Sequence, residues 1–190
     1  GEKFGTIGKT DKDGLDFSGC IAIPGFIDIH CHGGYGYDSN DAKADGLRRW
    51  AAALPAEGVT SFMPTVMTDE PGRMTKALKS IAEMRRRIDK GAAVLGIHLE
   101  GPFLSYAKRG AQAAENLHAP DAEMFHRLNA ASGNNVRLVT VAPEEGGALD
   151  FIREVSKTCT VSLGHTSADY DTAMAAFQAG ASHATHLFNG

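Results

Sequence analysis

The feature that most constrains the fold of this chain is the regular alternation of short apolar segments with segments of helical periodicity. The apolar segments are predicted to be strands, and they span residues 20–32, 59–66, 92–103, 135–143, 160–166 and 181–190. The segments between them are predicted to be helices, and they span residues 41–54, 71–89, 120–131, 147–157 and 168–179. Asp69 and Pro71 would supply an N-cap and a first-turn residue for the second of these helices. Such alternation, with nearly continuous apolar strands, is typical of a parallel sheet covered by helices.

The type of parallel sheet can be narrowed further. The sequence contains neither G-x-G-x-x-G nor G-x-x-x-x-G-K-[ST], the signatures of two nucleotide-binding sheets. We therefore expect a TIM-like (β/α)8 barrel, of which about six β/α units fall within residues 21–190. Residues 1–20, which include "KDGLDFSG", have turn chemistry instead and are expected to belong to a small β domain.

The first strand ends in the stretch "IDIHCHGGYG", which places two histidines where a strand gives way to a glycine-rich loop. Because side chains two apart share a face of a strand, Asp28, His30 and His32 are expected to point one way. Two imidazoles in adjacent inward positions can bind one cation. The alternative is that both histidines only form hydrogen bonds with loops, so this motif alone does not decide between the two interpretations.

Three further strand ends carry the same kind of side chain. Glu100 follows His98 in "GIHLEGPF", His165 lies in "SLGHTS", and His186 lies in "THLFNG". A charged carboxylate inside a barrel must be paired or bound to a metal, because leaving it unpaired costs several kcal/mol or more; a salt bridge from Glu100 to Lys or Arg is the simpler alternative. Taken together, the strand ends predict a site for zinc or iron at the carboxyl edge of the sheet, where barrel enzymes place their active sites. Its predicted ligands are His30, His32, Glu100, His165 and His186.

The remaining histidines have simpler interpretations. His98 is expected to be a structural residue of the barrel interior or a partner of the ligands. His118 and His126 lie in or beside a helix and are expected to be solvated. His183, three residues before His186, is expected to point away from the site.

The composition excludes several classes of function. The chain has 19 Lys and Arg against 23 Asp and Glu, a net charge of −4, so no basic surface for nucleic acid is expected. Its 3 cysteines form no C-x-x-C pair and fit a reducing, cytoplasmic environment. No apolar run approaches the roughly 18 residues that a membrane span needs, so no membrane association is expected.

Several motifs together resemble a known family. "PGFIDIHCHGGYG", "GVTSFMPT", "GIHLEGPFLSYAKRGAQ", "LGHTSADY" and "ATHLFNG" are similar to the amidohydrolase superfamily and, within it, to the N-acetylglucosamine-6-phosphate deacetylases. The resemblance implies a metal-dependent (β/α) barrel joined to a small β-sandwich, of which residues 1–20 would be a remnant. It also implies a cytoplasmic enzyme of amino-sugar metabolism, usually dimeric, that hydrolyses N-acetylglucosamine 6-phosphate to glucosamine 6-phosphate and acetate.

The resemblance also implies roles for individual residues. It makes Glu100, His165 and His186 the main metal ligands, while His30 and His32 would complete a second site bridged by Glu100, giving one or two zinc or iron ions. The segment "VRLVTVAP" lacks the lysine that related dihydroorotases use as a bridge, which favours the deacetylase branch.

Residues that contact the sugar are implied in the same way. They are Ala111, Gln112, Asn189 and Gly190. The proton-transferring Asp of the family matches no residue in this chain and is expected beyond Gly190. We therefore expect the chain to be a fragment that is inactive alone. Two alternatives remain open: an N-acetylgalactosamine-6-phosphate deacetylase, and a metal- or sugar-binding fragment without catalysis.

Overall fold

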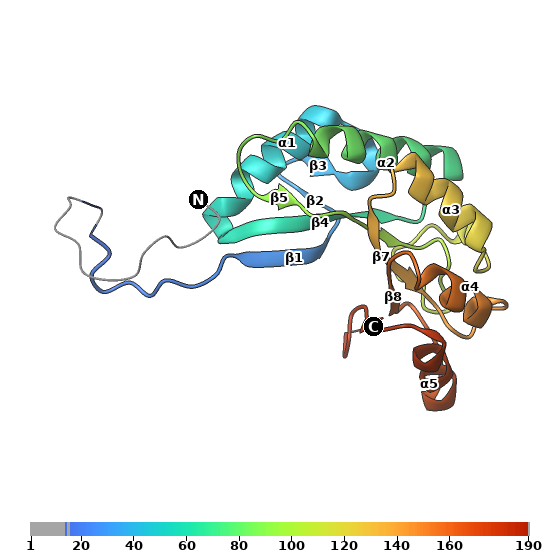
Figure 1. The fold of residues 1–190 in the computed structure, drawn as a ribbon. Coiled ribbons are helices and arrows are strands. Elements are labelled where there is room, and N and C mark those ends of the chain that lie inside the picture. Colours follow the sequence, from blue (N-terminus) through green and yellow to red (C-terminus); the bar gives the residue numbers. More distant parts are fainter. Residues whose placement is uncertain (1–13, 15, 190) are drawn as a thin grey trace.

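The structure, a computed structural model, describes residues 14 and 16–189, and it consists of a parallel sheet with helices packed against it (Figure 1). The strands are β1 (Phe26–Cys31), β2 (Gly33–Gly34), β3 (Tyr37–Asp38), β4 (Val59–Met67), β5 (Ala93–Val94), β6 (Ile97–Glu100), β7 (Val136–Val141), β8 (Thr160–Leu163) and β9 (His183–Ala184). The helices are α1 (Ala44–Ala53), α2 (Pro71–Arg85), α3 (Ala122–Ala131), α4 (Ala148–Val155) and α5 (Tyr170–Ala179), with short 3-10 helices at Ser39–Asp41, Leu54–Glu57 and Ala114–Asn116.

The main sheet has the strand order β1-β4-β6-β7-β8-β9, and every neighbouring pair in it is parallel. The short strand β5 pairs with β4, while β2 and β3 form a separate antiparallel pair. Strand direction rotates progressively from β1 and β4 to β7 and β8, so the sheet is curled (Figure 1). Sequential parallel strands with intervening helices are the pattern of a (β/α) barrel. The predicted fold class, an incomplete TIM-like barrel, is therefore confirmed.

The hydrophobic core lies between the sheet and the helices, which follow one another around it as neighbours. Near the first helix, the ring of Trp50 packs 4.8 Å from that of Phe62 in β4. Farther along, Phe151 of α4 contacts both Phe103 and Phe125, with ring centroids 4.8 and 6.0 Å apart. This packing fixes the outer face of the sheet and leaves its carboxyl edge free to carry polar side chains.

Five of the six predicted strands are shorter than expected, and three of them change most. Segment 92–103 divides into β5 and β6, because Leu95 donates a backbone hydrogen bond to Phe62 on one side and Ile97 donates to Asn135 on the other. Segment 181–190, within its described residues 181–189, keeps strand structure only at β9, because the backbone turns at His186, whose φ is 55°. Segment 20–32 becomes a strand only at Phe26.

The helix boundaries also need correction. The N-cap of α2 is Glu70, not Asp69; the Asp69 carboxylate instead accepts from the backbone N–H of Glu70 and lies 3.3 Å from Arg73. The predicted helix 41–54 is a 3-10 turn followed by α1, separated at Ala42, which has a φ of 54°.

Two further expectations can be compared only with the residues that the structure describes. The predicted small β domain at residues 1–20 falls mostly outside the described residues, and residues 14 and 16–20 contain no strand. Within the described part of the chain, every helix is too short or too polar to cross a membrane.

Candidate metal centre

Five predicted ligands meet at the carboxyl edge of the sheet. His30 lies in β1 and His32 directly follows it, while Glu100 is the last residue of β6. His165 and His186 each lie two residues beyond a strand, after β8 and β9. Because parallel strands end at the same edge, residues far apart in the sequence converge on one carboxylate.

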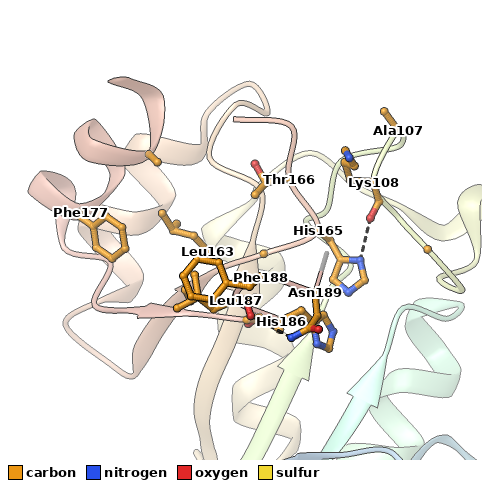
Figure 2. A pocket seen from close by; sticks show the side chains of 15 residues that line it. Ala107, Lys108, Leu163, His165, Thr166, Phe177, His186, Leu187, Phe188 and Asn189 are labelled. Atoms are coloured by element: carbon orange, nitrogen blue, oxygen red, sulfur yellow. Dashed lines mark hydrogen bonds between the residues drawn. The ribbon is translucent and has the colours of Figure 1, made fainter. Parts of the chain in front are cut away.

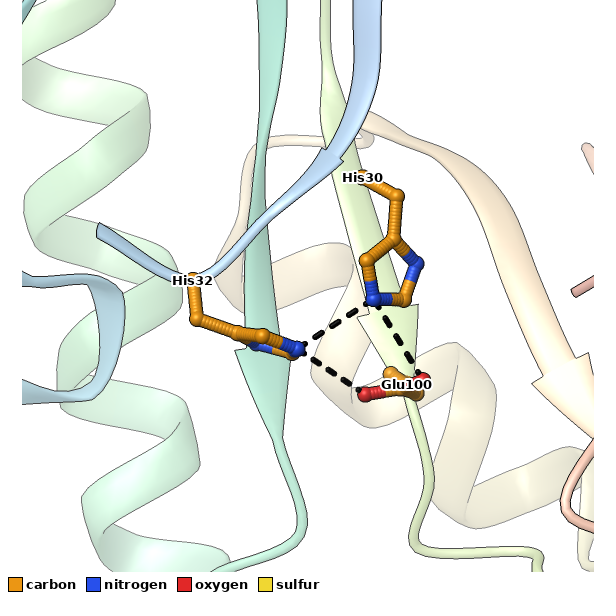
Figure 3. Close-up of side chains that lie close together, drawn as sticks. All are labelled: His30, His32 and Glu100. Atoms are coloured by element: carbon orange, nitrogen blue, oxygen red, sulfur yellow. Dashed lines mark hydrogen bonds and ion pairs between the residues drawn. The ribbon is translucent and has the colours of Figure 1, made fainter. Parts of the chain in front are cut away.

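The first group of donors consists of His30, His32 and Glu100 (Figure 3). Nε2 of His30 lies 3.5 Å from Oε1 of Glu100, and Nε2 of His32 lies 3.3 Å from Oε2. The two imidazole nitrogens are 3.2 Å apart. Metal–nitrogen bonds of about 2.0–2.1 Å in a tetrahedral site place donors roughly 3.3 Å apart, so this spacing fits a shared cation.

The second group consists of Glu100, His165 and His186. Nε2 of His165 and Nε2 of His186 lie 2.9 and 2.8 Å from Oε1 of Glu100. Glu100 therefore belongs to both groups, with Oε1 facing His165 and His186 and Oε2 facing His32.

In His165 and His32, the hydrogen bond at Nδ1, on the side of the ring away from Glu100, indicates which nitrogen carries a proton. Nδ1 of His165 lies 2.9 Å from the carbonyl oxygen of Lys108, and Nδ1 of His32 lies 3.3 Å from that of Thr65. A carbonyl oxygen only accepts, so each Nδ1 donates. In a neutral ring, Nε2 then directs its lone pair at a Glu100 oxygen, which is also an acceptor. A cation between the two acceptors resolves this conflict, so the donor set fits a metal ion.

The electrostatics of the centre are dominated by Glu100, whose side chain is 1% exposed. Burial would raise the pKa of Glu100, but without a bound cation the His165 and His32 rings can take a second proton, and hydrogen bonds from these rings together with the charge of nearby imidazoles hold this pKa well below its ordinary value. Hydrogen bonding to Glu100 in turn raises the pKa of His32 and of His165, whereas burial lowers the pKa of His30. The carboxylate is thus ionised and ready to bind a cation.

Gln112 contacts the same carboxylate, a role that its sequence position did not reveal. Its side chain is buried and its Oε1 accepts a 2.8 Å hydrogen bond from the backbone N–H of Thr68. This bond directs Nε2 to donate to Oε2 of Glu100 at 2.8 Å. Gln112, predicted to contact substrate, therefore also holds the carboxylate in this structure.

A cavity of about 600 Å³ adjoins the second group (Figure 2). His165, His186 and Asn189 line one part of it, and an apolar wall is formed by Leu163, Phe177, Leu187 and Phe188. Its volume is within the range of about 300–1,000 Å³ for small-molecule sites. Asn189, predicted to contact substrate, thus lies next to the candidate metal centre.

The other two predicted substrate residues are placed differently. Ala111 is exposed and lines a separate hollow with Asp69 and Arg73. Gly190 lies outside the described residues.

Among the described residues, the histidines that were not predicted as ligands form no hydrogen bond or ion pair with Glu100. His98 is buried and bonded to Ile29 and Thr140, and burial lowers its pKa to about 3. His183 bonds to Ser162. His118 and His126 are exposed, although His126 also pairs with Glu154.

Backbone geometry marks two of the candidate ligands. His165 and His186 have φ values of 51° and 55°, in a left-handed region that is uncommon for residues other than glycine. Such strain tends to occur at functional sites. Nothing in the sequence pattern signalled these conformations.

Comparison with known proteins agrees with this arrangement. The family described as "Amidohydrolase family" matches residues 21–190. The N-acetylglucosamine-6-phosphate deacetylase of Bacillus subtilis is 42% identical over 173 residues, which are 89% of this chain and 44% of that protein. An N-acetylgalactosamine-6-phosphate deacetylase of Escherichia coli is 39% identical over 171 residues, covering 90% of this chain and 45% of that protein.

A solved structure gives the same picture. The N-acetyl-D-glucosamine-6-phosphate deacetylase of Mycobacterium smegmatis superposes with a TM-score of 0.82 at 37% identity, covering 88% of this chain and 43% of that one. The chain therefore spans less than half the length of these relatives. Since the family match extends over nearly the whole chain, and the strand-end histidines and glutamate lie where a barrel enzyme places its chemistry, the chain belongs to the amidohydrolase family.

Proposed function

We propose that this protein acts as a metal-dependent deacetylase, which hydrolyses N-acetylglucosamine 6-phosphate to glucosamine 6-phosphate and acetate. The observation that carries the proposal is the convergence of four imidazole nitrogens on the buried Glu100 carboxylate, in a chain of the amidohydrolase family. The names of the bacterial relatives support the substrate and the reaction.

The amidohydrolase family is metal-dependent, and both donor groups could hold an ion. We propose zinc or iron, because imidazole and carboxylate donors suit both metals. Glu100, His165 and His186 would hold the first ion, and His30 and His32 would hold a second that shares Glu100. A bound divalent cation lowers the pKa of water from about 15.7 toward 7 and polarises a carbonyl oxygen.

The protein's own residues would orient the donors and the substrate. The carbonyl of Lys108 fixes the ring of His165, and the Gln112 amide fixes Glu100. Asn189 and Gly190 would contact the sugar beside the cavity, and Ala111 and Gln112 would do so from the loop after β6. We propose that an Asp beyond Gly190 transfers the proton to the leaving amine.

We also propose a second domain, an oligomeric state and a location for the whole protein. Residues 1–20 would belong to a small β-sandwich, and the intact enzyme would be a homodimer, both by resemblance to the deacetylases. A cytoplasmic location is supported by the three cysteines, which are all free.

We also propose that residues 1–190 have no deacetylase activity when expressed alone. In the described sheet, β1 and β9 each pair with a single strand, so both edges are open. The proposed proton-transferring Asp would also be missing. A soluble monomer of residues 1–190 that released acetate at about 10 per second, a usual enzyme rate, would overturn this proposal.

The second candidate is deacetylation of the galactosamine epimer, which the Escherichia coli relative favours. The two functions predict different substrate preferences. Acetate release by the full-length natural protein should therefore be measured with each sugar phosphate alone and with both in competition. A higher kcat/KM for the glucosamine compound supports our proposal, and a preference for the galactosamine compound supports the alternative. Tight metal binding without acetate release from either sugar would show a binding role instead.

A further inference from the structure

A continuous chain of side-chain hydrogen bonds crosses the inner side of the sheet below the candidate ligands. It links the side chains of His98, Thr140, Thr185, Ser162 and His183, in that order, and we call these five residues the polar layer. The successive distances are 2.8 Å from His98 Nε2 to Thr140 Oγ1, 2.9 Å from there to Thr185 Oγ1, 2.6 Å to Ser162 Oγ and 2.8 Å to His183 Nδ1. At its start, Nδ1 of His98 lies 3.2 Å from the carbonyl oxygen of Ile29 in β1.

Four members of the polar layer are buried, His183 is half-buried, and the layer spans several strands. His98, Thr140 and Ser162 are at most 1% exposed and lie in β6, β7 and β8, while Thr185 is 8% exposed and directly follows β9. Buried hydroxyl groups must find hydrogen-bond partners, and each of the three hydroxyls in the polar layer has two. The layer therefore connects β6, β7, β8 and β9 through side chains, and the backbone carbonyl of Ile29 joins it to β1.

The order of the donors follows from the carbonyl end. The Ile29 carbonyl only accepts, so Nδ1 of His98 donates to it, and in the neutral ring Nε2 accepts from the Thr140 hydroxyl. The Thr140 hydroxyl has only one proton, which it donates to His98, so it must accept a hydrogen bond from the Thr185 hydroxyl. By the same logic Ser162 donates to Thr185, and Nδ1–H of His183 donates to Ser162. Every proton in the layer thus has a fixed place.

Wherever a strand or the loop after it carries a candidate ligand, a residue of the polar layer, or Ile29 whose carbonyl bonds to the layer, lies close before that ligand in the sequence. Ile29 precedes His30, and Thr185 precedes His186. His98 lies two residues before Glu100, and Ser162 lies three residues before His165. The ring of His98 also packs against that of His30, with centroids 4.8 Å apart. Thr140, in the middle, belongs to β7, which carries none of the predicted ligands.

We propose that the polar layer positions the candidate metal ligands, and that the Thr140 hydroxyl is its central link. The layer fixes the relative placement of the strand ends, so the imidazole nitrogens stay converged on Glu100. Thr140 is a positioning residue because its hydroxyl bonds to His98 and Thr185 and to none of the predicted ligands, while its backbone lies beside that of Glu100 in the neighbouring strand. This inference rests on the metal site of the proposed function.

The test compares Thr140→Val, which keeps the shape but removes the hydroxyl, with Thr140→Ser, which keeps the hydroxyl. Both are made in the full-length natural protein. Zn²⁺ affinity is measured by competition with a chromophoric chelator, well below the melting temperature of every variant. The visible spectrum of the Co²⁺-loaded protein reports the ligand geometry. Ser162→Ala and Ser162→Thr provide a second pair that breaks and restores the layer at another point.

We expect Thr140→Val to bind Zn²⁺ about tenfold more weakly, at the lower end of the effect of altering groups that support metal ligands. Its Co²⁺ spectrum should change, while Thr140→Ser should match the wild type in both measurements. If Thr140→Val has a lower melting temperature but unchanged affinity and spectrum, the layer only stabilises the fold and the inference is wrong. Equal losses in Thr140→Val and Thr140→Ser would also overturn it. A wild-type protein that binds no Zn²⁺ would instead refute the metal site itself, and the inference with it.

Discussion

Glutamine in place of Glu100 should remove metal from the protein, because this carboxylate is the one donor that both groups share. The change keeps the shape of the side chain and removes its charge. In the structure each group has three protein donors, so Glu100→Gln leaves two charge-neutral imidazoles in each. Changing a group that merely supports a ligand weakens metal binding roughly 10–100-fold. We therefore expect a loss of at least about 100-fold for this shared ligand.

The assay is elemental analysis of full-length protein after dialysis, together with Zn²⁺ titration against a chelator. His30→Ala is the comparison, because His30 belongs to one group only, and this variant should keep at least half of the bound metal. Glu154→Gln is the matched control for the chemical change, since Glu154 is exposed and pairs with His126 away from the site. Wild-type metal content in Glu100→Gln would refute the ligand assignment, and so would equal losses in Glu100→Gln and His30→Ala.

Three more predictions follow from single residues. Asn189→Ala should lower kcat/KM by the equivalent of about 1–3 kcal/mol for a lost substrate hydrogen bond, with metal content unchanged; unaltered kinetics would remove Asn189 from the substrate site. Gly101→Ala should destabilise the protein in urea by at least about 1–3 kcal/mol, because Gly101 has a φ of +95° and an added Cβ would lie 2.1 Å from Oγ1 of Thr68; Gly146→Ala, which meets no atom within 4 Å, is the control and should be tolerated. Burial lowers the pKa of His98 to about 3, so the folded state binds fewer protons than the unfolded state between about pH 6.5 and 3. The free energy of unfolding of the metal-free protein should fall as the pH is lowered through this window, and it should fall less in His98→Gln. Urea titrations at pH 7 and pH 5 measure this free energy. The same loss between the two pH values in the wild type and in His98→Gln would contradict the prediction.

The convergence of the candidate ligands could be predicted because it depends on one property of parallel sheets. His30, Glu100, His165 and His186 each fall at or just beyond a strand end, and the carboxyl ends of successive parallel strands meet at one edge. Strand periodicity and residue type therefore sufficed to bring four distant segments together. The fold class followed from the same alternation of strands and helices.

Other features depend on contacts that no local pattern encodes. Gln112 lies in an irregular loop, and its contact with Glu100 is set by a backbone N–H at the end of β4. The division of segment 92–103 results from backbone bonds to two different neighbours, which the hydropathy of the segment does not reveal. The polar layer could not be predicted from the sequence either, because its hydroxyls come from separate strands and meet only in the folded sheet.

The central claim is that Glu100 and the histidines around it hold a divalent metal, and anomalous X-ray diffraction tests it most directly. Crystals of the full-length natural protein, purified without added metal, should be measured on both sides of the zinc and iron absorption edges. The account predicts an anomalous peak within bonding distance of Glu100, His165 and His186, with a second peak beside His30 and His32 if two ions are bound. Crystals with no anomalous peak at Glu100, even after they are soaked in zinc or iron, or with a metal bound only elsewhere, would contradict it.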